Sequence, residues 1–325
     1  MLDRRLTLPR TELSVSRLCL GGNRFGGALD QDRSFALLDA FLESGGNFID
    51  TAHVYADWIE GNEPSSSEKT IGRWLRSRRP SGVVVATKGG HPPLSDPHVP
   101  RLEAAALRRD VEESLDYLGR STLDLFYVHR DDPKRPVEDV LGNLENLRRD
   151  GLVRHYGASN WSTARLWEAQ RIADAHGWQG FVANQAEWSL AIRNPDTVPG
   201  DLHVMAGPMV EFHQRTGMAS VPYSSQARGY FDKVSGSLDE ATARLYDGED
   251  NRATARDLTR IAGPMNATPT QLMLAVLIRA PFPVVPVIGC RTPEQVRSSF
   301  ASLSLVLAPE QVMILFQGRM SVEGR

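Results

Sequence analysis

Four side chains of the kinds that hold or transfer protons occur in the first half of the chain: Asp50, Tyr55, Lys88 and His129. A buried lysine needs a partner because an unpaired buried charge is costly, and Asp50 is a candidate for it. An ammonium close to a phenol favours the phenolate, so we expect Lys88 to lower the pKa of Tyr55 from about 10. Such a phenol would act as a general acid, and His129 would orient the same substrate oxygen.

Each of these residues ends or closely follows an apolar run that is typical of a buried strand. Asp50 lies in the run 47–51, Lys88 ends the run 83–88 and His129 ends the run 123–129. Singly, each side chain has a simpler role, as a turn cap, a solvated cation or a packing aromatic. The carboxyl ends of barrel strands meet at one face, where enzymes of this architecture carry their active sites. We therefore expect the four residues to share one rim.

The alternation of strand and helix patterns continues along the whole chain. Strands are expected at 17–21, 47–51, 83–88, 123–129, 153–159, 181–187, 219–224 and 284–288, and helices at 32–44, 67–77, 102–118, 137–149, 163–175, 201–216, 269–279 and 293–301. Eight such units predict one α/β domain over residues 1–325, a single (β/α)8 TIM barrel. We also expect an N-terminal β-hairpin within 5–16, plugging the barrel bottom, and long loops at the C-terminal face.

An open doubly wound sheet is the alternative fold. Such a sheet would carry a GxGxxG fingerprint in its first strand–helix turn. Residues 21–27 read Gly-Gly-Asn-Arg-Phe-Gly-Gly, which is rich in glycine but does not match that spacing. The barrel is therefore the favoured architecture.

The composition argues against a nucleic-acid-binding, membrane-spanning or disulfide-rich protein. The net charge is −3, so no basic field favours nucleic acid or an anionic membrane as partner. No apolar run is long enough to span a membrane, and the first residues lack a signal core. Two cysteines, Cys19 and Cys290, make no disulfide framework. We expect a cytoplasmic enzyme without a metal, since no His, Cys and Asp cluster has ligand spacing and His91 and His98 lie in a proline-rich loop without partners.

Around the four proton-handling residues, the chain resembles the aldo-keto reductase family. The motifs that carry the resemblance are Gly-Asn-Phe-Ile-Asp-Thr-Ala-His-Val-Tyr at 46–55, Ala-Thr-Lys at 86–88, Tyr-Val-His-Arg at 127–130, Val-Arg-His-Tyr-Gly-Ala-Ser-Asn at 153–160 and Pro-Val-Ile-Gly-Cys-Arg-Thr-Pro-Glu-Gln at 286–295. The resemblance implies that a nicotinamide cofactor delivers hydride to a carbonyl carbon while Tyr55 protonates the oxygen. Lys88, held by Asp50, would tune Tyr55, and His129 would position the carbonyl.

The remaining strand ends are a cofactor site under the same resemblance. Ser159, Asn160 and Gln185 would hold the nicotinamide carboxamide by hydrogen bonds. Tyr223 would stack on the nicotinamide ring, and the backbone from Ser224 through Arg228 would meet the pyrophosphate. The loop departs from the family pattern here, because it reads Tyr-Ser-Ser-Gln-Ala-Arg-Gly at 223–229, where many relatives have Pro-Leu after the first Ser.

The turn after the last strand is the candidate phosphate site. Gly289 and Arg291 precede a helix start, and helix N-termini bind anions. The guanidinium of Arg291 suits a 2′-phosphate, which favours NADPH, with NADH as the alternative cofactor. Gln295 matches a residue that relatives use for the cofactor. Relatives also carry a Glu-Asn pair that contacts adenosine, where this chain has Ser298 and Ser299.

Aromatic residues after three of the strands are candidates for the substrate pocket: Trp58, Trp188 and Tyr230. Alternatively, these residues pack the loops.

The sequence is compatible with three functions. The leading one is an NADPH-dependent reductase of small-molecule aldehydes and ketones. The others are a nucleotide-binding regulatory or sensor subunit with little turnover, and a barrel lyase or isomerase in which Lys88 forms a Schiff base.

Overall fold

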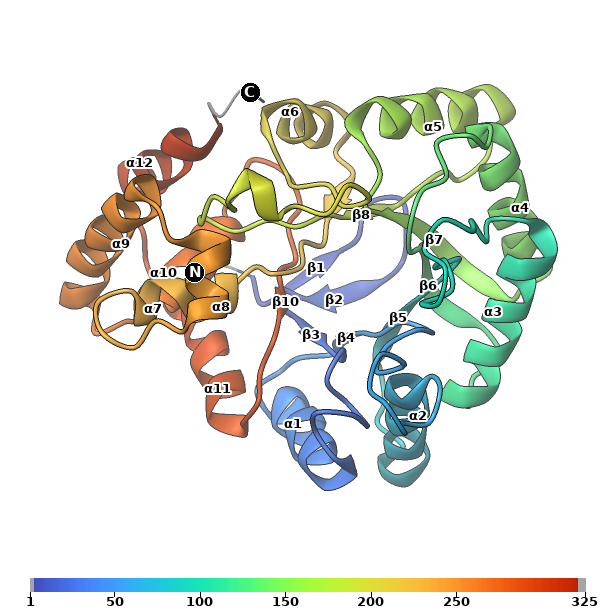
Figure 1. The fold of residues 1–325 in the computed structure, drawn as a ribbon, viewed down its shortest axis with the longest axis horizontal. Coiled ribbons are helices and arrows are strands. Elements are labelled where there is room, and N and C mark those ends of the chain that lie inside the picture. The colour runs from blue at the N-terminus through green and yellow to red at the C-terminus, as the bar shows by residue number, and fades with distance from the viewer. Residues whose placement is uncertain (1–2, 321–325) are drawn as a thin grey trace.

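The structure, a computed structural model that describes residues 3–320, has eight parallel strands curled into a barrel and ringed by helices (Figure 1). The strand order is β10-β3-β4-β5-β6-β7-β8-β9. The strands are β3 (Cys19–Gly21), β4 (Phe48–Asp50), β5 (Val84–Gly89), β6 (Leu123–Val128), β7 (Val153–Ser159), β8 (Ala183–Gln185), β9 (Ala219–Ser220) and β10 (Val287–Ile288). The bridge between Ser220 and Val284 joins the last two strand segments and closes the ring. The predicted (β/α)8 barrel is confirmed.

A helix follows each strand and packs outside the barrel. These helices are α1 (Gln31–Glu43), α2 (Ser66–Arg78), α3 (Ala104–Leu118), α4 (Val137–Arg149), α5 (Thr163–His176), α6 (Gly207–Thr216), α10 (Pro269–Leu277) and α11 (Pro293–Ala301). Side-chain caps fix several starts, because a capping oxygen satisfies a backbone N–H that has no partner within the helix. The Asp30 carboxylate accepts from Arg33 N, and Thr268 forms a capping box with Gln271.

Prolines explain why three elements are shorter than predicted. The helix expected at 201–216 begins only at Gly207, because Pro208 sets its first turn and Ala206 is extended. The strands expected at 219–224 and 284–288 shrink to β9 and β10. Pro222 and Pro286 lie at their ends, and proline has no N–H to donate to a ladder.

The long segment between β9 and α10 is largely helical. It contains η2 (Ala227–Gly229), α7 (Tyr230–Lys233), α8 (Glu240–Tyr246), α9 (Glu249–Ala262) and η3 (Gly263–Met265). Short 3-10 turns occur at η1 (Pro195–Thr197) and η4 (Ser302–Ser304), and α12 (Pro309–Met320) follows. Among the described residues no single helix is long and apolar enough to cross a membrane; the bent pair 293–304 and 309–316 passes that test only when taken together.

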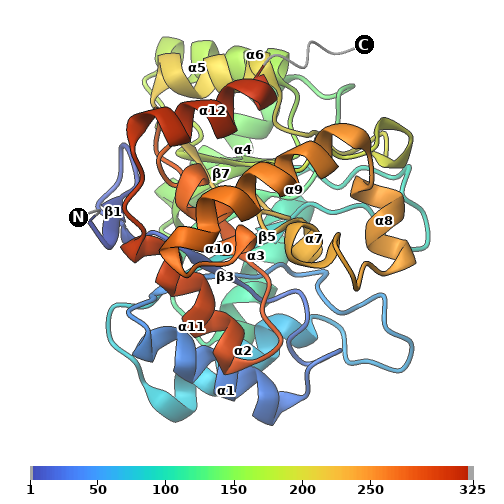
Figure 2. The ribbon, with the colours of Figure 1, turned by 90° about the vertical axis from the view of Figure 1, so that its left-hand side faces the viewer.

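The predicted N-terminal hairpin is confirmed. Strands β1 (Arg5–Thr7) and β2 (Ser14–Ser16) pair antiparallel. Leu8, Leu13 and Val15 are buried in one cluster with side chains of the barrel interior, including Phe48 and Leu125. Figure 2 shows this hairpin at one end of the barrel, with α8 and the long loops at the other. The hairpin therefore fills the bottom and leaves the carboxyl ends of the strands open to the loops.

Candidate functional site

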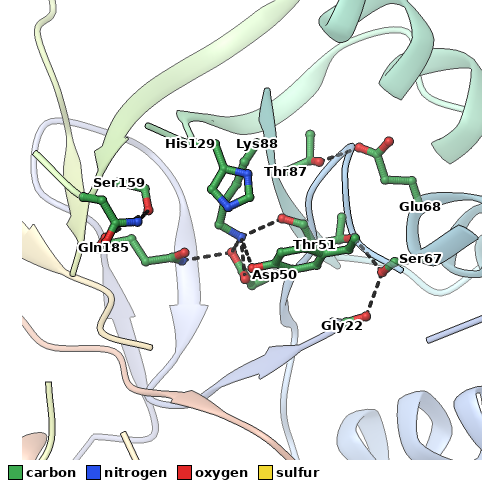
Figure 3. A network of polar contacts seen from close by, with 12 residues as sticks. Gly22, Asp50, Thr51, Ser67, Glu68, Thr87, Lys88, His129, Ser159 and Gln185 are labelled. Atoms are coloured by element: carbon green, nitrogen blue, oxygen red, sulfur yellow. Dashed lines mark hydrogen bonds and ion pairs between the residues drawn. The ribbon is translucent and has the colours of Figure 1, made fainter. Parts of the chain in front are cut away.

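Lys88 and Asp50 form a buried ion pair at the carboxyl ends of β5 and β4 (Figure 3). Lys88 Nζ donates to Asp50 Oδ1 at 2.8 Å, to Asp50 Oδ2 at 2.7 Å and to the Thr51 carbonyl oxygen at 2.7 Å. Both side chains are buried, as the burial pattern of the two strands requires. Burial alone would lower the pKa of Lys88, but Asp50 and Tyr55 raise it above its usual value, so the ammonium stays charged.

Tyr55 lies on the turn that follows β4 and reaches back to this ammonium. Lys88 Nζ donates to the Tyr55 hydroxyl at 3.1 Å. The backbone N–H of His53 donates to the Lys88 carbonyl at 2.9 Å, and Tyr55 N–H donates to Ala52 O at 3.0 Å. The predicted proximity of the phenol and the ammonium is thus present in the structure.

The expected net lowering of the pKa of Tyr55 is wrong. Burial raises the pKa of this phenol above 10, and the opposing effect of Lys88 does not cancel it. The sequence indicates the neighbouring charge but not the degree of desolvation, which disfavours the phenolate. Tyr55 therefore keeps its proton at neutral pH and has it available for donation.

His129 stands beside Tyr55 as an uncharged ring. The two rings meet edge to face with centroids 5.8 Å apart. Burial, Arg130, Lys88 and His91 hold the pKa of His129 well below its usual 6.5. Its Nδ1 is buried without a hydrogen-bond partner among the described residues. A neutral imidazole can donate one hydrogen bond to an oxygen near Tyr55 without adding a second positive charge.

Four predicted cofactor residues form a chain of hydrogen bonds that ends on Asp50. Tyr223 OH donates to Asn160 Oδ1 at 2.8 Å, and Asn160 Nδ2 donates to Ser159 Oγ at 3.1 Å. Ser159 Oγ donates to the Gln185 carbonyl at 3.0 Å, and Gln185 Nε2 donates to Asp50 Oδ1 at 2.9 Å. A chain of hydrogen bonds therefore links the amide and hydroxyl groups of β7 and β8 to the ion pair of Lys88 and Asp50.

Three arginines gather where β3, β9 and β10 end. Burial, together with the guanidinium groups of Arg291 and Arg228, lowers the pKa of Arg24, which places the three charges close together. Within residues 3–320 none of the three side chains has an ion pair or hydrogen bond. Sequence reasoning missed Arg24, because it reaches the cluster only when β10 pairs with β3 across the closed barrel. A cluster of unpaired guanidiniums is a site for anionic groups.

Side-chain amides hold the turn that carries Arg291. Gln226 Oε1 accepts from Gly289 N at 2.9 Å, and Gln295 Oε1 accepts from Arg291 N at 2.7 Å. Ser224 has a left-handed backbone with φ 53, as does Arg228 with φ 55, which is uncommon for residues other than glycine. The predicted residues Gly289 and Gln295 thus border Arg291, and both Gly289 N–H and Gln295 already have partners within the protein. Ser224 lies in the same loop as Arg228.

Comparison with known proteins agrees with this arrangement. The sequence profile of the Aldo/keto reductase family matches residues 17–317. The chain belongs to this family. It is 32% identical to norsolorinic acid reductase stcV of Emericella nidulans over 95% of this chain and 79% of that protein. It is 29% identical to an aryl-alcohol dehydrogenase [NADP(+)] of Phanerodontia chrysosporium over 96% of this chain and 84% of that protein.

The fold also matches a solved aldo-keto reductase. The crystal structure of the thermostable aldo-keto reductase Tm1743 with the inhibitor epalrestat superposes with a TM-score of 0.74 and 25% sequence identity. The match covers 98% of this chain and 100% of that one. The chain is therefore an NAD(P)H-dependent oxidoreductase of the aldo-keto reductase type that acts on small-molecule carbonyl compounds.

Only one of the three aromatic residues predicted for the reductase's substrate pocket lies at the site. Trp58 is 52% exposed and its ring meets Tyr55 edge to face, with centroids 6.0 Å apart. Trp188 is buried between the rings of Phe282 and Phe316. Tyr230 is fully buried, and its hydroxyl donates to an Asp247 oxygen. Trp188 and Tyr230 pack the outer helices and loops, so their predicted place in the pocket is not supported.

His91 is a site neighbour that the sequence did not reveal. It was expected to have no partner, but its ring packs edge to face against His129 with centroids 4.8 Å apart. It also borders a cavity of about 300 Å³ between the Tyr55 turn and the loop after β5, whose walls include Val54, Leu94 and Arg101. The loop after β5 therefore contributes a wall next to the candidate site.

Proposed function

We propose that this protein is an NADPH-dependent carbonyl reductase that converts aldehydes or ketones to alcohols, with Tyr55 as the general acid. The observation that carries the proposal is the 3.1 Å contact between the Tyr55 hydroxyl and Lys88 Nζ, in which Lys88 is fixed by Asp50. We further propose that residues 1–325 act as one barrel domain.

The proton transfer follows from the charges around Tyr55. The nicotinamide supplies the hydride to the carbonyl carbon when it is bound. As negative charge develops on the carbonyl oxygen, the Tyr55 hydroxyl gives up its proton to it, and the product is an alcohol. The tyrosinate left behind is stabilised by the ammonium of Lys88 until solvent restores the proton. His129, being uncharged, orients the carbonyl oxygen by a hydrogen bond.

The residues present fit a phosphorylated dinucleotide. The guanidiniums of Arg24, Arg228 and Arg291, which have no carboxylate partner within residues 3–320, form a cationic cluster at one end of the strand rim. At the other end, Ser159, Asn160 and Gln185 offer hydroxyl and amide groups for a carboxamide. Tyr223 lies beside Asn160, where its ring would lie against a nicotinamide. We assign the 2′-phosphate of NADPH to Arg291, and a relative whose name includes NADP(+) supports this choice over NADH.

Aryl carbonyl compounds are the proposed substrate class. One relative is named as an aryl-alcohol dehydrogenase, so by its name it acts on aryl compounds. In this chain the rings of Trp58, Tyr55, His129 and His91 form a continuous row of edge-to-face contacts. Such rings favour a planar aromatic ligand, because aromatic pairs gain about 0.5–1.5 kcal/mol beyond simple burial.

The geometry disfavours a Schiff-base enzyme. A nucleophilic lysine needs a lowered pKa, whereas Asp50 and Tyr55 raise the pKa of Lys88 despite its burial.

Stopped-flow oxidation of bound NADPH with a panel of aryl aldehydes tests the proposed carbonyl reduction. We expect rapid loss of the cofactor absorbance in the wild type. Tight NADPH binding with no hydride transfer to any aldehyde would instead identify a nucleotide-binding sensor.

A further inference from the structure

Glu68 is a buried carboxyl group that the proposed chemistry does not use. Its side chain is fully buried, and among the described residues no lysine or arginine pairs with it. Its Oε1 accepts a hydrogen bond from Thr87 Oγ1. Within residues 3–320 its Oε2 has no hydrogen-bond partner, although the Ser114 hydroxyl is close enough to lower its pKa. An ionised carboxylate in such a place is costly, so the uncharged form is favoured. Consistent with this, burial raises the pKa of Glu68 to about 7.

Two consecutive residues of α2, Ser67 and Glu68, contact two residues next to Lys88, namely Thr51 on the turn after β4 and Thr87 in β5 (Figure 3). Thr51 Oγ1 lies 2.7 Å from Ser67 Oγ, and the carbonyl oxygen of Thr51 is an acceptor of Lys88 Nζ. Glu68 binds the hydroxyl of Thr87, the residue that precedes Lys88 in β5. Successive strand side chains point to opposite faces, so Thr87 faces the helices while Lys88 faces the barrel interior.

The first turn of α2 is itself held in place. Ser67 Oγ donates to the Gly22 carbonyl at 2.8 Å, and Ser66 Oγ donates to the Gly26 carbonyl at 2.7 Å. Further along the helix, a Cβ added at Gly72 would lie 1.9 Å from the Tyr117 carbonyl oxygen, so α2 approaches the backbone of α3 too closely for any side chain. The turn is therefore a fixed support and not a loop that adjusts to the strand.

We propose that the first turn of α2 is a clamp that positions Lys88, in which Ser67 holds Thr51 and uncharged Glu68 holds Thr87. Glu68 contacts Thr87 on the helix-facing side of β5 and acts through Lys88, so it is a positioning residue. Its effect on catalysis rests on the proposed function, since it acts through the contact of Lys88 with Tyr55.

The surroundings of Glu68 make the clamp sensitive to its protonation. The titratable groups that interact with its charge are His53 on the Tyr55 turn, and Asp110 and Tyr117 on α3. His53 Nε2 is engaged with Glu113, and Asp110 accepts from Arg101 and from Gly90 N. Neither is a dedicated counterion for Glu68. Ionisation would therefore place an uncompensated charge against β5, next to the lysine that it supports.

The position of Lys88 can be measured without cofactor or substrate. The sequence has only four lysines, Lys69, Lys88, Lys134 and Lys233, so the ammonium signal of Lys88 is resolvable in ¹⁵N-lysine-labelled full-length protein and is assigned by its loss in Lys88→Met. We expect Glu68→Ala and Thr87→Val to shift this signal and to speed its hydrogen exchange about tenfold. Glu68→Gln should leave it unchanged at pH 6.

The matched control removes another buried carboxylate, Glu145, which lies on α4 and is engaged with Arg148 and Tyr156. Glu145→Gln should leave the Lys88 signal unchanged. If Glu68→Ala unfolds the chain, Thr87→Val provides the test instead, because it replaces only the hydroxyl group, by a methyl group. A Lys88 signal that is unaltered in folded Thr87→Val would overturn the clamp.

Steady-state kinetics with NADPH and an aryl aldehyde then measure the effect of the clamp on kcat. We expect kcat of Glu68→Ala to fall about tenfold with an unchanged Kd for NADPH. The wild type should lose kcat above pH 7, and Glu68→Gln should lack that decline. Identical pH profiles would refute the role of the uncharged form. A wild type that reduces no carbonyl compound would refute the proposed function, while the lysine signal would still decide the clamp.

Discussion

Lys88 Nζ donates to the Tyr55 hydroxyl at 3.1 Å while the Asp50 carboxylate and the Thr51 carbonyl take its other hydrogen bonds. The ammonium therefore cannot turn away from the phenol without breaking buried hydrogen bonds. Burial keeps the proton on Tyr55, so under the proposed mechanism Lys88 would stabilise the tyrosinate after the proton has left. Under that mechanism Tyr55 donates its proton during the reaction and is not ionised in the resting protein.

Tyr55→Phe should keep NADPH binding and lose most carbonyl reduction. The ring remains to pack against Trp58 and His129, whereas the proton donor is removed. General acids contribute about 10²- to 10⁴-fold to rate, so we expect kcat to fall by that order. Single-turnover oxidation of NADPH measures the loss, and fluorescence titration checks binding. Turnover close to that of the wild type would reject Tyr55 as the acid.

Asp50→Asn should destabilise the protein strongly. The change leaves the ammonium of Lys88 buried without a counterion, and breaking a buried ion pair in this way costs about 3–5 kcal/mol. Urea unfolding of the variant gives the free energy directly. The double variant Asp50→Leu with Lys88→Met should lose less, because it removes both charges. An equal or larger loss in the double variant would show that the pair does not dominate the effect.

Arg291→Ala should weaken NADPH far more than NADH. A hydrogen bond to a charged group contributes about 1.5–3 kcal/mol, which corresponds to roughly 10- to 150-fold in Kd. Isothermal titration with both cofactors measures the two losses. Arg24→Ala is the companion variant: a loss confined to NADPH would place Arg24 at the 2′-phosphate, and an equal loss would place it at the pyrophosphate. Equal losses in Arg291→Ala would remove our 2′-phosphate assignment.

The sequence predicts the parts of the site that depend on strand ends. Asp50, Lys88 and His129 each close an apolar run, and in a parallel barrel such ends share one face. The hairpin and the strand–helix order follow from the same periodic signals. Trp188 could not be placed in this way, because its direction is decided by contacts with Phe282 and Phe316, which come from segments remote in the chain.

Other features need the closed fold. Arg24 joins Arg291 only because β10 pairs with β3. From the sequence alone, Glu68 is an ordinary acidic residue in the first turn of a helix, where the helix dipole favours a negative charge. Its burial against Thr87 is a tertiary effect. The pKa of Tyr55 likewise depends on how much water the fold excludes, which no spacing of residues reveals.

Glu68 should make the stability of the protein fall as pH rises toward neutrality. Burial raises its pKa from 4.5 to about 7 in the folded state. A raised folded pKa means that the folded chain binds the proton more tightly. The resulting stability is fully present below about pH 4.5 and is lost as pH rises through 7, by about 3 kcal/mol in total.

Urea unfolding of the wild type and of Glu68→Gln from pH 4 to pH 8.5 tests whether stability falls as pH rises. The difference in unfolding free energy should grow with pH in favour of Glu68→Gln, because glutamine carries no charge at either extreme. Glu145→Gln is the matched control, since burial would raise the pKa of Glu145 but Arg148 and Tyr156 lower it overall. That carboxylate stabilises the fold above pH 4.5, so its variant should lose stability relative to the wild type as pH rises. Parallel pH curves for Glu68→Gln and the wild type would mean that Glu68 is already ionised in the folded protein.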